Sequence, residues 1–154
     1  MRVLEEKLQN LDRNLIKITK LYALPFARFS IFVIYLWFGL LKIFSASPAN
    51  PLVSSLLSQT MPLISFQDFI VFFGIFEVLI GIILIIPRLE RLGILLLILH
   101  LVTTVMPLFL LPEITWQSFL VPTLEGQYII KNILIVALAI GIFAHLHSLK
   151  PHQD

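Results

Sequence analysis

The clearest pattern in this sequence is a series of four long apolar stretches, separated by segments rich in proline, serine and charge. An α-helix needs about 20 residues, at 1.5 Å each, to cross the roughly 30 Å hydrocarbon core of a bilayer. Each apolar stretch meets this length, so the sequence predicts four transmembrane helices. They run over about Phe26–Phe44, Phe66–Ile86, Leu92–Leu111 and Tyr128–Leu146.

A different pattern precedes the first span. From residue 2 to about residue 22, apolar residues recur at spacings of three and four, and Lys, Arg, Glu and Asp fill the opposite side. The apolar positions are Leu4, Leu8, Leu11, Leu15, Ile18 and Tyr22. This spacing puts them on one helical face, which predicts an amphipathic helix lying in the membrane interface. A partner-binding coiled coil is the alternative, although three heptads are few for one.

The basic residues predict the orientation of the chain. Nine of the eleven lysines and arginines lie at or before the start of the first span, in the short middle connection or after the last span. Because cytoplasmic loops carry an excess of Lys and Arg, both termini and the middle connection are expected on the cytoplasmic side. The predicted organisation is an interfacial helix over residues 1–24, a four-helix bundle over 25–147 and a cytoplasmic tail over 148–154.

The composition supports an all-α membrane protein surrounded by a lipid bilayer. Of the 154 residues, 58% are hydrophobic and 13% are charged, more apolar surface than a soluble domain of this size could bury. The net charge of +2 gives no indication of a nucleic-acid partner. The sequence has no cysteine, which excludes thiolate chemistry and Cys-ligated metals.

The two long connections, over residues 45–65 and 112–127, are unusually apolar for segments outside a membrane span. In the first, Asn50 is expected to cap a short helix that has Pro51 in its first turn. The second contains Trp116 and Phe119. The sequence leaves open whether these connections lie in the outer interface as anchors or fold over the bundle as a lid.

Four ionisable side chains lie inside the predicted spans: Lys42, Glu77, His100 and Lys131. A charged group there costs about 2.5–3.5 kcal/mol on insertion scales, so each needs an explanation. Glu77 and His100 are each eleven residues from the outer end of their span, or about 16 Å, which places both near the midplane. Lys42 and Lys131 lie only a few residues from an outer end. The expected arrangement therefore has two levels, with the two lysines nearer the outer surface and Glu77 and His100 nearer the midplane.

Each span also carries a face of polar or small residues around these groups. Helical spacing places the members of each set on one side of their helix. The sets are Tyr35, Gly39 and Lys42; Gly74, Glu77 and Gly81; His100, Thr103, Thr104 and Pro107; and Tyr128, Lys131 and Asn132. Small residues allow close helix approach, and Pro107 is expected to kink the third span. A four-helix bundle would turn these faces inward, towards a shared site that binds a ligand or handles a proton.

These residues also have purely structural interpretations. Either lysine could extend to the outer headgroups, and Glu77 could form a structural ion pair or stay protonated. His100 could be held neutral by a backbone carbonyl. Thr103 and Thr104 could bond to carbonyls of their own helix. No catalytic role is assigned to any of them from the sequence.

The sequence does not predict a metal site or a cofactor site. His145, His147 and His152 gather near the C-terminus, but His145 and His147 are two residues apart and diverge on a helix. No Gly-rich phosphate loop, HExxH motif or Ser–His–acid set is present. Ordinary hydrolase chemistry is therefore unsupported.

Several short motifs resemble the DoxX-like family of integral membrane proteins, in particular its RclC-like branch. They are Gly39–Lys42, GIFEVLIG over Gly74–Gly81, Thr103-Thr104 and PTLEGQYIIKN over Pro122–Asn132, and the resemblance covers about residues 26–144. It implies a four-helix bundle in a bacterial inner membrane and an association with redox or oxidant-stress systems. Related proteins include a subunit of a thiosulfate–quinone oxidoreductase and a member of a mycobacterial oxidoreductase complex. The resemblance supplies no catalytic mechanism.

Three functional hypotheses follow. The first is an accessory subunit that binds a small amphiphile or a quinone-like ligand, with electrons supplied by a redox partner protein. The second is a non-catalytic membrane anchor or assembly subunit, in which the intramembrane charges are interhelical pairs. The third is a small proton-coupled transporter. A homo-oligomer is compatible with all three, and enzymatic activity is not expected of the isolated chain.

Overall fold

The structure, a computed structural model, describes residues 2–146 and is almost entirely helical. Four helical stretches are long and apolar enough to cross a membrane, in agreement with the predicted all-α membrane protein of four spans. They are Glu5–Ile43, Phe66–Ile85, Glu90–Leu110 and Leu124–Ala144. In chain order the elements are α1 (Arg2–Ile43), α2 (Asn50–Thr60), α3 (Phe66–Ile85), α4 (Glu90–Val105), α5 (Pro107–Leu110), α6 (Pro112–Thr115), β1 (Trp116–Ser118), β2 (Val121–Pro122), α7 (Leu124–Lys131) and α8 (Ile133–Ala144).

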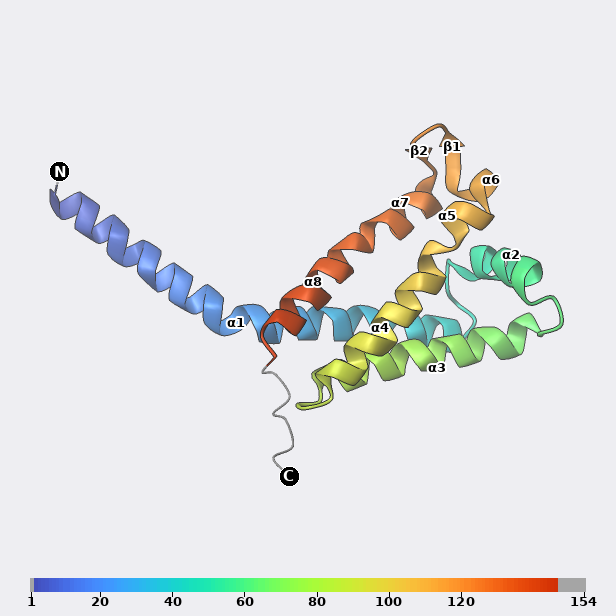
Figure 1. Ribbon diagram of the computed structural model, residues 1–154, viewed down its shortest axis with the longest axis horizontal. Helices are drawn as coiled ribbons and strands as arrows, with labels where there is room; N and C mark the ends of the chain where they lie inside the picture. Colours follow the sequence, from blue (N-terminus) through green and yellow to red (C-terminus); the bar gives the residue numbers. More distant parts are fainter. Residues whose placement is uncertain (1, 147–154) are drawn as a thin grey trace, which may run out of the picture.

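The N-terminal segment and the first span form a single helix. α1 extends without interruption from Arg2 to Ile43 and contains Pro25. Figure 1 shows α1 projecting away from the other helices at its N-terminal end and bending where it reaches them. Proline lacks an N–H and its ring crowds the carbonyl four residues earlier, which bends a helix that continues through it. The structure thus joins two elements that the sequence analysis separates near residue 24.

The third and fourth spans begin earlier than the sequence predicts. α4 starts at Glu90, two residues early, and α7 starts at Leu124, four residues early. The Thr123 side chain caps α7 by accepting a hydrogen bond from the Gly126 N–H, at 3.2 Å. A threonine at this position satisfies one of the unpaired amides of the first turn, so the helix can begin before the apolar run does.

Both of these spans are also interrupted. α4 ends at Val105 and α5 begins at Pro107, so the predicted kink at Pro107 is confirmed. α7 ends at Lys131 and α8 begins at Ile133, with Asn132 between them. The interruption at Asn132 is not predicted from the sequence.

The connection over residues 45–65 contains the predicted short helix, α2. Pro51 lies in its first turn as expected, but the N-cap is Ala49 and the predicted capping role of Asn50 is wrong. The Asn50 side-chain amide donates to the Ser45 carbonyl instead, at 3.2 Å. The reason is local: the bend after α1 brings that carbonyl within reach of the amide.

The connection over residues 112–127 forms α6 and a small antiparallel hairpin of β1 and β2. The Trp116 indole N–H donates to the Leu108 carbonyl at 3.0 Å, which ties the hairpin to α5. Figure 1 shows α2 and the hairpin at the same end of the molecule. Both connections are therefore ordered, packed structures, and their role as lid or anchor remains a prediction.

Among the described helices, α1 and α3 make the most extensive contact. A Cβ atom added at Gly39 would lie 2.7 Å from the Gly74 carbonyl oxygen, and one added at Gly74 would lie 2.7 Å from the Gly39 carbonyl oxygen. Each glycine thus makes room for the backbone of the other helix. This contact is what small residues provide in membrane helices, where close packing replaces the hydrophobic effect as the driving force.

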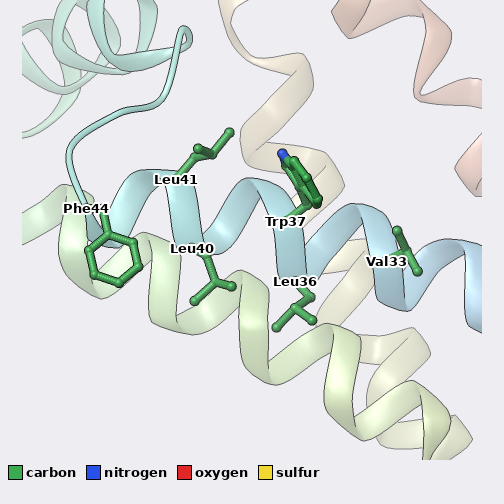
Figure 2. A pocket seen from close by; sticks show the side chains of 6 residues that line it. All are labelled: Val33, Leu36, Trp37, Leu40, Leu41 and Phe44. Atoms are coloured by element: carbon green, nitrogen blue, oxygen red, sulfur yellow. The ribbon is translucent and has the colours of Figure 1, made fainter.

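The other side of α1 is exposed along its length. In the spanning part of the helix it carries a shallow apolar groove of about 290 Å³. Figure 2 shows the groove lined by Val33, Leu36, Trp37, Leu40, Leu41 and Phe44. Such a surface suits contact with lipid chains or with another apolar helix.

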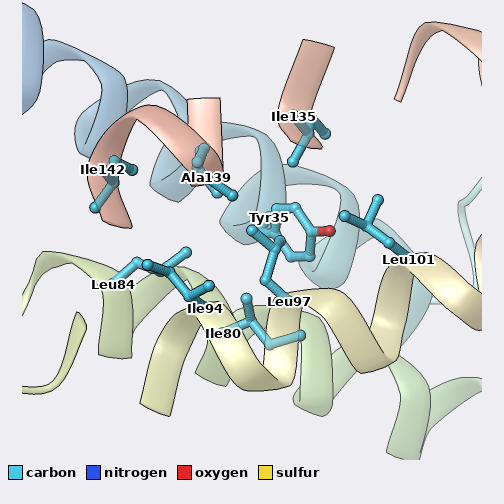
Figure 3. Close-up of a cluster of buried hydrophobic side chains, with 10 residues drawn as sticks. Tyr35, Ile80, Leu84, Ile94, Leu97, Leu101, Ile135, Ala139 and Ile142 are labelled. Atoms are coloured by element: carbon cyan, nitrogen blue, oxygen red, sulfur yellow. The ribbon is translucent and has the colours of Figure 1, made fainter. Parts of the chain in front are cut away.

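A buried apolar core joins the four spans. Its side chains come from α1, α3, α4 and α8, and most of them are labelled in Figure 3. They are Ile31, Tyr35, Ile80, Leu84, Ile94, Leu97, Leu101, Ile135, Ala139 and Ile142. Tyr35 contributes the only hydroxyl of this set, and it marks the border between the core and a polar cluster.

At the C-terminal end of α3, Arg28 of α1 links three helices. The Arg28 guanidinium donates to the carbonyls of Leu84 and Ile85, both at 2.8 Å, and forms an ion pair with Glu90 at 3.0 Å. The carbonyls of a last helical turn have no partner within their helix, and a cation there also complements the helix dipole. Arg28 therefore caps α3 and holds α1 and the start of α4 against it.

The glycine contact predicts a difference between two substitutions. Gly39→Ala should lower the stability by about 1–3 kcal/mol, because a rigid backbone carbonyl occupies the space that the methyl group needs. Gly141→Ala is the matched control, since a Cβ there meets nothing within 4 Å. Thermal unfolding of both variants in lipid nanodiscs measures the difference. Equal midpoints for the two variants would contradict the contact.

Candidate functional site

An ion pair lies at the centre of the polar cluster. The Lys42 ammonium donates to both carboxylate oxygens of Glu77, at 2.8 Å and 2.6 Å. Lys42 and Glu77 are only 6% and 5% exposed. The pair links α1 to α3, so each charge that is costly in hydrocarbon has the other as its partner.

His100 extends the cluster to α4. Its Nε2 lies 2.9 Å from Glu77 Oε1, and its Nδ1 lies 3.0 Å from the Tyr35 hydroxyl. In a neutral imidazole one nitrogen donates and the other accepts. If Nε2–H donates to the carboxylate, Nδ1 accepts from the Tyr35 O–H, and each group is satisfied. The result is a continuous hydrogen-bonded chain, Lys42–Glu77–His100–Tyr35, across three helices.

The two threonines support His100 from its own helix. The Thr103 and Thr104 hydroxyls donate to the His100 carbonyl, at 2.7 Å and 2.9 Å. Thr104 Oγ1 also lies 3.3 Å from His100 Nδ1. The structural interpretation of these threonines, bonding to a carbonyl of their own helix, is therefore confirmed. They fix the backbone that carries the imidazole.

Aromatic rings surround the imidazole. Phe73 stacks on His100 with ring centroids 5.0 Å apart, and Tyr35 approaches it edge-on at 5.1 Å. Phe76 lies 6.3 Å away, and the Lys42 ammonium sits 5.7 Å from the Phe73 ring centroid. Neither Phe73 nor Phe76 was predicted from the sequence to belong to the site. Phe73 could have been found, because it precedes Glu77 by four residues and so shares its helical face.

The glycine contact allows the charges to meet. Gly39 precedes Lys42 by three residues and Gly74 precedes Glu77 by three, so each lies one turn from its charged residue on the same face. Because these glycines bring the backbones of α1 and α3 together, the two charged groups can reach each other directly. Among the described residues, the one buried side-chain polar atom without a partner is Asn50 Oδ1, which lies outside the cluster.

The predicted two-level arrangement is wrong for Lys42. A Cβ added at Gly74 would lie 3.0 Å from the Ile43 amide nitrogen, so the end of α1 packs against the middle of α3. α3 therefore extends beyond the end of α1, and Lys42 lies beside Glu77. The prediction failed because it measured depth from the ends of helices that do not end at the same level. Extension of Lys42 to the headgroups is also excluded by its burial.

The structure leaves the fourth span outside the cluster. Lys131 is exposed, and its ammonium lies 5.5 Å from the ring centroid of Tyr128, which is exposed as well. Asn132 is half-buried at the break between α7 and α8. Of the nine residues that the sequence proposes, six are brought together, on α1, α3 and α4, and these three are not.

No group of three or more His, Cys, Asp or Glu side chains is placed to hold a metal within residues 2–146. His145 Nδ1 lies 2.7 Å from the Gly141 carbonyl of its own helix. His147 and His152 are outside the described residues.

An apolar groove of about 830 Å³ runs between α4 and α8. Its lining includes Leu101, Val105, Phe109, Ala139 and Phe143, and none of the cluster's ionisable groups lines it. Leu101 follows His100 directly, and Figure 3 shows the Tyr35 hydroxyl pointing towards Leu101. Leu101 therefore lies between the polar cluster and the groove.

Comparison with known proteins gives no match, whether to a family model, to a curated protein or to a solved structure. The resemblance to the DoxX-like family therefore stays a proposal, and the geometry carries the functional argument.

The ion pair predicts a non-additive pair of substitutions. Lys42→Met should lower the free energy of unfolding by about 3–5 kcal/mol, because it leaves the Glu77 carboxylate buried without its cation. Adding Glu77→Gln removes that uncompensated charge, so the double variant should lose less than the sum of the two single variants. Denaturant unfolding in a membrane mimetic measures all three. Lys131→Met is the control, and a loss from it as large as that from Lys42→Met would contradict the assignment.

Proposed function

We propose that this chain is a multi-pass protein of a bacterial inner membrane that serves as an accessory subunit of a redox or oxidant-stress system. Its hydrogen-bonded chain of Lys42, Glu77, His100 and Tyr35 would hold and relocate a proton beside a small amphiphilic, quinone-like ligand. The observation that carries the proposal is the continuous chain itself, which links four buried groups from three helices.

The chain has the properties that proton handling needs. Carboxylate, imidazole and phenol can each give or take a proton, and neighbouring members lie at hydrogen-bond distance. Buried ionisable groups in a membrane are costly to keep, which favours a function over an accident of sequence.

The neighbouring groove supports an amphiphilic ligand. Its apolar lining and its volume of about 830 Å³ suit an isoprenoid or acyl chain. The lining includes Leu101, towards which the Tyr35 hydroxyl points in Figure 3. A ligand carbonyl next to Leu101 would accept a hydrogen bond from the Tyr35 hydroxyl, in competition with His100. Since the sequence contains no cofactor motif, electrons for any redox step would come from a partner protein.

The proposed orientation places both termini and the middle connection in the cytoplasm, as the positive-inside rule predicts. The four spans would form a bundle with α2 and the hairpin on the outer side. A ligand would reach the polar cluster from the outer half of the bundle, and the cluster itself would lie near mid-depth, because Glu77 and His100 are each about half-way along their spans.

One observation favours a second candidate, the non-catalytic assembly subunit. Each carboxylate oxygen and each imidazole nitrogen of the cluster already has a partner within the chain. In a cluster whose hydrogen bonds are all satisfied, fixing the arrangement of the spans is a sufficient role, and no ligand is needed. The two candidates differ in whether a ligand is retained.

Mass spectrometry of lipid-like molecules retained by gently purified protein tests the proposal. The wild type should retain a quinone-like amphiphile, and Tyr35→Phe should lose most of it, because the substitution removes a single hydrogen bond and keeps the ring in the core. Tyr128→Phe is the matched control, since that tyrosine is exposed and outside the cluster. A wild-type protein that retains no such molecule would refute ligand binding and leave the assembly subunit.

Because the chain has no cysteine, single cysteines report its orientation directly. Cysteines at Leu63 and Phe119, which are 99% and 90% exposed in the two long connections, should react with an impermeant maleimide in intact cells. A cysteine at Arg88 in the middle connection should react only after permeabilisation. The opposite labelling pattern would invert the proposed topology.

A further inference from the structure

The N-terminal part of α1 has an apolar face that nothing in the structure covers. Every residue from Glu5 to Ala23 is exposed. The exposed fractions of Leu8, Leu11, Leu15 and Ile18 are 59%, 61%, 56% and 55%. A row of apolar side chains this exposed, in the part of α1 that packs against no other helix, requires a partner or a surface to cover it.

The spacing of this face fits a coiled coil. Leu8, Leu11, Leu15, Ile18 and Tyr22 alternate spacings of three and four, so they occupy consecutive a and d positions of a heptad pattern. An interfacial helix needs only a broad apolar face, whereas an a/d seam is the narrower pattern of helices that pack on each other. Between Glu5 and Tyr22 the other apolar side chains are Leu21, beside the seam at position g, and Ile16, away from it at position b. The seam therefore favours another helix as its cover.

The charges beside the seam point to a second copy of the same chain. With Leu8 at position a, Lys7 occupies position g and Asp12 position e. In a parallel coiled coil, position g of one helix faces position e of the next heptad of its partner. Lys7 of each copy would then face Asp12 of the other, which gives two opposite-charge pairs by symmetry. The next such pair, Asn14 with Thr19, is uncharged and causes no repulsion.

The opposite side of the helix gives weaker support for a lipid surface. Between Glu5 and Tyr22 there are four basic and three acidic side chains, which leave a single net positive charge. Attachment to anionic headgroups relies on an excess of Lys and Arg. α1 also continues from this segment into the span as one helix, with a bend and no separate turn onto a surface.

The seam is continuous with an exposed face of the span. Phe26, Phe29, Val33, Trp37 and Leu40 follow Tyr22 at spacings of three and four, and all five are exposed. Three of them, Val33, Trp37 and Leu40, line the shallow groove of Figure 2. Two copies inserted in the same orientation would present both faces to each other in parallel.

We propose that the N-terminal part of α1 pairs with the same segment of a second copy of this chain as a parallel coiled coil. Three heptads are short for an isolated coiled coil. Here, however, the helix is already extended by the span, so no separate nucleation is needed. Confinement of both copies to one membrane raises their effective concentration.

Disulfide cross-linking of the full chain in membrane vesicles tests the proposal, and the absence of native cysteine makes it direct. Leu11→Cys, in the seam, should give a covalent dimer as its main product under mild oxidation. Arg13→Cys, on the outer side, should remain monomeric. Both residues are exposed, so neither variant should disturb the fold, which circular dichroism checks.

Charge exchange in the Leu11→Cys background identifies the partner. Asp12→Lys should lower dimer formation about fivefold, because two attractive pairs become repulsive. Adding Lys7→Glu restores opposite charges and should restore the dimer. The proposal would be overturned in favour of the membrane surface by two results together. The Leu11→Cys variant would remain monomeric, and a fluorophore attached at that cysteine would be quenched by nitroxides carried on lipids. Cross-linking to a different protein would overturn it in favour of a hetero-partner.

Discussion

The contact between Lys42 and Glu77 is the constraint on which the arrangement of the spans depends. Neither charge is stable alone in hydrocarbon, so α1 and α3 must meet at the level where the two groups touch. The mutual approach of Gly39 and Gly74 makes that meeting geometrically feasible. His100 then adds α4, because its imidazole completes the hydrogen bonding of the carboxylate. A polar cluster thus fixes the relative position of three helices that apolar packing alone would leave free to slide.

The fourth span has a different relation to this cluster. α8 contributes Ile135, Ala139 and Ile142 to the core, and neither α7 nor α8 contributes a polar group to the cluster. The groove between α4 and α8 lies on this side of the molecule, where no hydrogen bond of the cluster joins the two helices. The interface between α4 and α8 therefore depends on apolar contacts and lacks the polar links that join α1, α3 and α4.

The sequence predicts much of this molecule because a membrane leaves strong patterns. Length and hydropathy are enough to find the four spans, and the cost of buried charge is enough to bring Lys42, Glu77 and His100 together. Depth is harder to predict, since the level of Lys42 depends on how far α3 extends beyond α1. The break at Asn132 and the β1–β2 hairpin depend on tertiary contacts, such as the bond from Trp116 to the Leu108 carbonyl, that leave no periodic signal. Continuity of α1 through Pro25 was not predicted because the pattern changes there from amphipathic to apolar, and such a change does not show whether the backbone is interrupted.

The pairing of Lys42 with Glu77 also has a consequence for how the protein is made. The chain is synthesised from its N-terminus, so the first span enters the translocon before the residue that neutralises its lysine exists. Lys42 lies one residue from the end of α1, where its long side chain can keep the ammonium in the interfacial region while synthesis continues. The Lys42 ammonium can bind the Glu77 carboxylate only after α3 has been inserted, and the two glycines come into contact at the same stage. The position of this lysine at the end of a helix therefore lets a charged segment be inserted first and neutralised later.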